Sequence, residues 1–257
     1  MSDFDRNVAA RRGTFGAERA VAIDAGLRAY MIRVYNYMAA GVGLTGIVAW
    51  LTYQAAGGDA IVVSGGLIRG LTPFGQLIFS PVTSIVLLLG TLGMVFFISF
   101  RINRLQAGTA LALFFIYAGL LGVALSSIFV SYTGVSITRV FFISAASFGA
   151  LSLVGYTTQR DLSGFGSFLI MGLVGIILAS LVNIFLQSSG LDWMISVIGV
   201  FIFAGLTAYD TQRIKEMYDS MDDGTVAGRK AVMGALSLYL DFINLFLMLL
   251  RLFGDRR

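Results

Sequence analysis

Two aspartates lie beside or within long apolar runs of this sequence. Asp210 directly follows the run Trp193 to Tyr209, and Asp241 lies inside the last run, Ala231 to Phe253. An ionised carboxylate at the centre of a bilayer costs roughly 2.5 to 3.5 kcal/mol, so it persists only when it is paired, neutralised or hydrated. Asp241 is therefore the first candidate for a functional residue.

The spacing of the two aspartates predicts that they meet. Their sequence midpoint falls between Thr225 and Val226, inside the polar stretch Asp219 to Gly228, so an antiparallel pair of helices would place them at similar depth. This requires the first helix to continue beyond its apolar run to Tyr218. Two carboxyl groups in contact share a proton and titrate as one system. Protonated, the pair would bridge the helices; doubly ionised, it would repel itself until an arginine or a bound cation relieved the repulsion. We interpret it as a pH sensor.

Three polar residues recur at helical spacing in the last run. Ser237, Asp241 and Asn244 stand at positions i, i+4 and i+7, and Gly234 extends the same face by one position. One interpretation is that Ser237 and Asn244 line a pathway. The other is that they form hydrogen bonds between helices, typically worth about 0.6 kcal/mol each. The sequence leaves both open.

Histidine and cysteine are absent from the chain, which narrows the possible chemistry. Disulfides, thiolate metal sites, cysteine catalysis and serine-histidine hydrolysis are excluded. A carboxylate site without histidine suits hard cations such as calcium. We therefore predict transient calcium binding at Asp210 and Asp241, no catalytic residues and no cofactor. The net charge of +4 gives no reason to expect nucleic acid as a partner.

The elements that must position these residues are transmembrane helices. Hydrophobic residues make up 57% of the chain and charged residues 12%, and the mean hydropathy is +0.85. Such a composition, with apolar windows of about 20 residues, predicts an all-α integral membrane protein surrounded by lipid. The seven expected spans are Val34 to Tyr53, Leu77 to Phe100, Ala107 to Val130, Val140 to Thr158, Phe165 to Gln187, Trp193 to Tyr209, and Ala231 to Phe253.

Positive charge in the short loops predicts the orientation, because lysine and arginine are retained in the cytoplasm. A cytoplasmic N-terminus leaves Arg69 and Arg139 outside and places most other cations inside, namely Arg6, Arg11, Arg12, Arg19, Arg28, Arg33, Arg101, Arg104, Arg160, Arg213, Lys215, Arg229 and Lys230. The C-terminal arginines complicate this prediction, since a complete seventh crossing puts them outside; we favour the complete crossing. Residues 1–27, which lack an apolar core, are expected to form a polar cytoplasmic tail before a membrane domain of residues 28–257.

Two motifs resemble the signatures of the Bax inhibitor-1 family in its bacterial branch. The segment 208–215, Ala-Tyr-Asp-Thr-Gln-Arg-Ile-Lys, is similar to the sixth-helix signature, and the segment 235–246 is similar to that of the seventh helix. The resemblance covers most of the chain. It implies six helices around a central seventh, a bacterial inner membrane location, and a pH-sensitive calcium leak with the two aspartates as sensor. It also implies an arginine counter-ion at the end of the second helix, for which Arg101 is the positional match and Arg104 the alternative.

Three other functions remain open at this point. Bacterial relatives of the resembled family are reported to modulate the membrane protease FtsH, so a regulator that binds other membrane proteins is the principal alternative. A proton-coupled cation exchanger would also suit an acid pair. An intramembrane aspartyl protease is disfavoured, because residues 238–241 read Leu-Tyr-Leu-Asp where such enzymes have Gly-x-Gly-Asp, and their Pro-Ala-Leu motif is missing. We therefore expect no enzyme activity.

Overall fold

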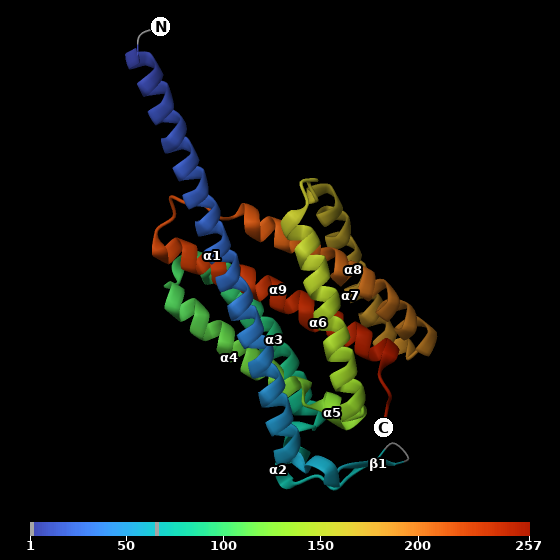
Figure 1. The fold of residues 1–257 in the computed structure, drawn as a ribbon. Helices are drawn as coiled ribbons and strands as arrows, with labels where there is room; N and C mark the ends of the chain where they lie inside the picture. Colours follow the sequence, from blue (N-terminus) through green and yellow to red (C-terminus); the bar gives the residue numbers. More distant parts are fainter. Residues whose placement is uncertain (1–2, 65–66) are drawn as a thin grey trace.

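The computed structural model describes residues 3–64 and 67–257, and long apolar helices dominate it (Figure 1). Seven helices within these residues are long and apolar enough to cross a membrane, which confirms the predicted all-α fold. Six of the spanning segments are α1 Asp3–Ala56, α3 Pro81–Arg101, α6 Gly134–Thr157, α7 Ser163–Leu186, α8 Ser189–Glu216 and α9 Gly224–Phe253, and α4 Ala107–Leu125 with the short α5 Ser127–Ser131 makes the other.

Polar caps decide where these helices begin and end, so the helices extend beyond the apolar runs. The fourth run was expected to start at Val140, yet α6 begins six residues earlier, where the Thr133 hydroxyl accepts a hydrogen bond from the Ser136 amide at 3.3 Å. Asp223 caps α9 in the same way, accepting from the Val226 amide at 2.7 Å. Capping side chains satisfy amides that have no partner inside the helix, whatever the hydropathy of the sequence that follows.

The first helix is the longest, and its N-terminal part projects beyond the rest of the bundle in Figure 1. Burial in the bundle begins at Tyr30, Met31 and Val34. Residues 1–2 lie outside the described part, as do the side chains of Arg6, Arg11, Arg12 and Arg19. The separate role predicted for the tail of residues 1–27 therefore stays a prediction.

Helix α9 is the centre of the bundle, as predicted. It packs directly on α1, α4, α6 and α8, whereas α3 packs mainly on α4, and α7 on α8, as an outer layer. Tyr239 of α9 is fully buried, and its hydroxyl lies 2.6 Å from the Thr45 hydroxyl of α1. The Thr45 hydroxyl also lies 2.9 Å from the Ala118 carbonyl oxygen of α4. These contacts join three helices at one buried point.

The connection between the first two spans contains the only strands in the described residues, and the sequence prediction missed them. It comprises η1 Gly58–Ala60, β1 Val62–Ser64, β2 Leu67–Arg69 and α2 Pro73–Ile78. The two strands form an antiparallel hairpin in which Val63 is opposite Ile68. Three residues per strand are too few for an alternating pattern to stand out from neighbouring apolar runs.

We call the end of the bundle with turns 102–106, 158–162 and 217–223 the N-terminal end, and the opposite end, with residues 57–80 and 254–257, the C-terminal end. Helix α9 connects the two ends. Its 30 residues span about 45 Å. Near its start, Arg229 donates to the Asn103 carbonyl at 2.7 Å, and the residues after its last turn bind the start of α6. The seventh segment therefore passes completely through the bundle, as we expected.

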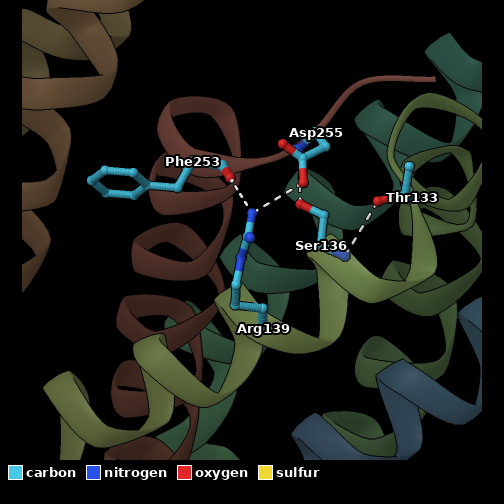
Figure 2. Close-up of polar contacts among 5 residues, drawn as sticks. All are labelled: Thr133, Ser136, Arg139, Phe253 and Asp255. Atoms are coloured by element: carbon cyan, nitrogen blue, oxygen red, sulfur yellow. Dashed lines mark hydrogen bonds and ion pairs between the residues drawn. The ribbon is translucent and has the colours of Figure 1, made fainter.

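We call residues 254–257 the C-terminal clasp, because polar contacts hold them against the rest of the bundle. Figure 2 shows the contacts that Asp255 and the Phe253 carbonyl make with α6. Arg139 of α6 forms an ion pair with Asp255 at 3.1 Å and donates to the Phe253 carbonyl at 3.2 Å. The Asp255 amide donates to the Ser136 hydroxyl at 2.8 Å, and the Thr133 amide donates to the Asp255 carbonyl at 3.1 Å. Side-chain and backbone contacts together fasten the chain end to α6.

The arginines that complicated the orientation prediction take part in this end of the bundle. Arg251 and Arg256 approach Asp192, at the start of α8, with distances of 3.6 Å and 3.9 Å. Arg257 donates to the Tyr53 hydroxyl of α1 at 2.9 Å. Because Asp192 pairs with Arg251 and Arg256, and Asp255 pairs with Arg139, the C-terminal end carries less uncompensated positive charge than its arginine count suggests.

Candidate functional site

The polar residues of α9 lie on the one side of that helix that the other helices leave partly open. Asp241 is only 5% exposed, and its neighbours Ser237, Leu240 and Asn244 are half-buried. The Asn244 amide donates to the Leu240 carbonyl of its own helix at 2.8 Å. Among the described residues, Oδ2 of Asp241 has no hydrogen-bond partner. A buried carboxyl oxygen without a partner is costly, which makes Asp241 the unusual member of this face.

The structure brings Asp210 of α8 next to Asp241. The two carboxyl groups lie within hydrogen-bonding range of each other. A hydrogen bond between two carboxyl groups needs one shared proton. The predicted meeting of the two aspartates is therefore present in the fold. It depends on α8 continuing to Glu216, six residues beyond Asp210.

Polar contacts fasten that extension of α8 to the turn between α6 and α7. The Gln212 side chain accepts from the Leu162 amide at 2.9 Å and donates to the Arg160 carbonyl at 2.8 Å. Lys215 donates to the Tyr156 carbonyl at 2.9 Å. Sequence reasoning did not single out Gln212, although it is buried among apolar helices, and a buried amide between helices is itself a signal of such a role.

Two glycines let α8 approach its neighbours on either side of Asp210. A Cβ atom at Gly155 of α6 would collide with the Ala208 carbonyl, and one at Gly166 of α7 would collide with the Tyr209 ring. Small residues at helix contacts in membranes permit this close approach. The depth and rotation of Asp210 therefore depend on residues that carry no chemistry themselves.

A cavity of about 610 Å³ contains the aspartate pair. It lies among α3, α7, α8 and α9, and its lining combines polar residues near the pair with a long apolar wall. The lining residues include Asp210, Arg213, Ser237, Asp241, Asn244, Tyr209, Leu92, Ile184 and Met248. A smaller hollow of about 70 Å³ shares Asp210, Arg213 and Ser237 and adds Met217 and Met233, toward the N-terminal end. Ser237 and Asn244 both line the cavity, as the pathway interpretation requires.

The cation that lines this cavity is Arg213, one helical turn after Asp210. Its charge acts on Asp210 directly. Arg101 and Arg104 are exposed near the end of α3, and neither lines the cavity, to which α3 contributes Leu92. The counter-ion role of Arg101 stays a prediction, and Arg213 is the residue that sequence reasoning missed. The spacing of Asp210 and Arg213, i and i+3 on one helix, was the available signal.

The donor set of the pair is small for a resident calcium site. Among the described residues, no group of three or more acidic, histidine or cysteine side chains comes together. Calcium takes six to eight oxygen ligands, more than two carboxylates supply. Asp210 and Asp241 therefore suit a passing cation that keeps part of its water better than one held permanently.

Comparison with known proteins agrees with this description. The fold and the buried acid pair define the class, a polytopic helical membrane protein with a charged internal site. Residues 27–257 match the family model described as inhibitor of apoptosis-promoting Bax1. The chain belongs to the Bax inhibitor-1 family, which confirms the resemblance seen in its two motifs.

Several bacterial proteins are among its curated relatives. The chain is 48% identical over 236 residues to the inner membrane protein YbhL of Escherichia coli, covering 91% of this chain and 94% of that protein. It is 44% identical to a Rickettsia prowazekii protein over 91% of this chain and 92% of the other. A Caulobacter vibrioides protein is 43% identical over the full length of both chains. The protein is thus an integral membrane protein with relatives of the same length.

Proposed function

We propose that this protein is a pH-regulated leak channel for calcium and related cations. The observation that carries the proposal is the Asp210–Asp241 pair, which lies within a cavity of the membrane-spanning bundle. Two acids at this depth are costly unless the site handles protons or cations. A site that offers carboxylate oxygens and no histidine favours hard cations, of which calcium is the natural candidate.

The proposed gate is the contact between α8 and α9. With one shared proton, the carboxyl groups attract and hold the two helices together. When the proton leaves, two negative charges face each other in a site of low polarity, and the contact loosens. A cation entering between them restores attraction, so the same pair senses pH and attracts the permeating ion. The change is a shift of population between closed and open arrangements.

The proposed orientation places the N-terminal end in the cytoplasm. Arg101, Arg104, Arg160, Lys215, Arg229 and Lys230 belong to turns or helix ends there, in keeping with retention of positive charge inside. By analogy with the inner membrane protein YbhL, we propose the bacterial cytoplasmic membrane as the location. The small hollow at Met217 would then connect the pair with the cytoplasmic side.

Calcium flux into proteoliposomes across about pH 5 to 8 tests this proposal. The unmodified protein should conduct with a clear pH response, and Asp210→Asn and Asp241→Asn should each abolish that response. Asn244→Ala is the control for the pH response: it removes a polar side chain from the same cavity and leaves both acids in place, so it should keep the pH response whatever it does to the size of the flux. Absence of flux at every pH, or identical pH curves for all four proteins, would refute the channel.

The counter-ion is tested in the same assay. Arg213→Gln should change the pH at which flux is half-maximal, because Arg213 lines the cavity with Asp210. Arg101→Gln should do so only if the closed arrangement brings the end of α3 to the pair. Should neither variant change the curve, the pair works without an arginine.

A further inference from the structure

A groove between α1 and α6 is separate from the aspartate cavity, which α3, α7, α8 and α9 line. We call it the α1/α6 groove. It has a volume of about 600 Å³, and its residues are Arg28, Met31, Ile32 and Tyr35 of α1, and Phe148, Gly149, Ser152, Leu153 and Tyr156 of α6. None of these residues lines the cavity that contains Asp210 and Asp241.

The walls of the groove are apolar and open to the surroundings of the bundle. Ile32 is 49% exposed and Leu153 is 62% exposed. Both belong to membrane-spanning helices, so a hydrocarbon chain is the natural neighbour of these walls. The floor is polar, because the Tyr35 hydroxyl lies 2.5 Å from the Ser152 hydroxyl and joins the two helices there.

The end of the groove near Tyr156 carries two cations. Arg28 forms part of the groove itself. The Lys215 ammonium is 2.9 Å from the Tyr156 carbonyl oxygen and 5.4 Å from the centre of the Tyr156 ring. That hydrogen bond uses one of its three donors. Within residues 24–63 and 68–257, whose side chains are described, neither cation forms an ion pair, although Asp24 is one turn from Arg28.

We propose that the α1/α6 groove binds one acidic phospholipid, with its headgroup phosphate at Arg28 and Lys215 and an acyl chain along Ile32 and Leu153. Basic pockets between transmembrane helices on the cytoplasmic side are suited to acidic headgroups. Arg28 and Tyr35 are seven residue steps apart, about 10 Å along the helix, so the acyl chain lies between the cations at one end of the groove and the Tyr35–Ser152 contact at its floor. Arg28 contributes a fork of donors and Lys215 a point charge, both complementary to a phosphate.

This site does not depend on calcium conduction, so failure of the channel proposal leaves it untouched. It does touch the same helix, because Lys215 and Asp210 both belong to α8, and the Ser152 hydroxyl lies 2.9 Å from that of Thr211. A lipid in the groove therefore contacts the helix that carries one half of the aspartate pair.

The test is a titration of the purified full-length protein with phosphatidylglycerol and, separately, phosphatidylcholine, counting bound lipids by native mass spectrometry. One phosphatidylglycerol should be retained in preference to phosphatidylcholine. Arg28→Gln and Lys215→Gln should each weaken that binding about fivefold, as expected for one phosphate-facing cation. Arg33→Gln is the matched control, an exposed arginine of α1 outside the groove.

A second pair of variants tests the acyl chain without changing charge. A Cβ atom at Gly149 meets nothing within 4 Å, and Gly149 lines the groove, so Gly149→Leu places an apolar side chain there and should reduce retention of phosphatidylglycerol. Gly119→Leu, on α4 and equally open, should not. Equal retention of both lipids by the unmodified protein would overturn the proposal. So would equal losses in Arg28→Gln and Arg33→Gln, which would indicate only diffuse attraction to the surface.

Discussion

Asp241 and Asp210 face each other from two adjacent helices, and Oδ2 of Asp241 has no hydrogen-bond partner among the described residues. The pair therefore imposes a cost on the fold, because a buried carboxyl oxygen without a partner is unfavourable.

Replacing one acid of the pair should stabilise the protein when both would be ionised. In Asp241→Asn the charge is gone and the amide can donate to Asp210, so we expect a gain of about 1 to 3 kcal/mol at alkaline pH. Thermal unfolding of Asp210→Asn, Asp241→Asn and the double variant measures the coupling free energy between the two carboxyl groups. The double variant should gain less unfolding free energy than the two single variants gain together. Destabilised single variants with additive effects would mean that the carboxyl groups do not interact.

Gly155 should be intolerant of a side chain because it contacts the α8 backbone at Ala208. Gly155→Ala forces α6 and α8 apart next to the aspartate pair and should cost about 1 to 3 kcal/mol. Gly149→Ala on the same helix meets nothing within 4 Å and should change stability by less than about 0.5 kcal/mol. Thermal unfolding in detergent distinguishes the two, and equal stability of both variants would contradict this packing.

The complete crossing of α9 predicts that its two flanks lie on opposite sides of the membrane. The chain has no cysteine, so Met221→Cys and Arg256→Cys each introduce a single thiol. Met221 is 80% exposed, and the Arg256 side chain is 68% exposed. A membrane-impermeant thiol reagent should label Met221→Cys in inside-out vesicles and Arg256→Cys in right-side-out vesicles. Labelling of both from one side would contradict a complete seventh crossing.

The start of α7 should loosen at acid pH through a group outside the membrane. Hydrogen bonds from the Ser163 side chain and from its amide, the latter at 2.8 Å, hold the pKa of Asp161 below its usual range. A lowered pKa means that the ionised form stabilises this turn above the ordinary carboxyl value of about 3.9. The contribution is lost as the pH falls through the lowered value.

Hydrogen exchange of the first amides of α7 measures this effect. The protection factors of these amides, which correct for the slower intrinsic exchange at acid pH, should fall in the unmodified protein as the pH drops. In Asp161→Asn the side-chain oxygen that accepts from Ser163 remains but does not titrate, so the acid-dependent loss of protection should disappear. An unchanged acid response in that variant would assign it to another group.

The elements of this fold were readable from the sequence because lipid imposes a simple condition. Each run of apolar residues must satisfy its own backbone, so the runs from Ala107 and Phe165 could only be helices. The hairpin around Val63 and Ile68 was missed because it lies outside the runs, where pairing of strands decides the structure. Helix ends were misplaced for a related reason, since caps such as Thr133 act through one hydrogen bond and leave hydropathy unchanged.

The sequence by itself determined that seven apolar segments are long enough to cross a membrane as helices, and that the acid in the last needs a partner, because charge in hydrocarbon is intolerable without one. It also indicated Asp210 as that partner, from symmetry about the intervening loop. The central place of the last helix was implied by the family resemblance. Only the tertiary structure decided that Arg213, and not an arginine at the end of α3, lines the cavity. It also decided that Gly155 and Gly166 set the position of α8, and that the C-terminal clasp binds to α6. Those relationships depend on how helices rotate and approach each other, and side-chain packing between distant segments fixes that geometry.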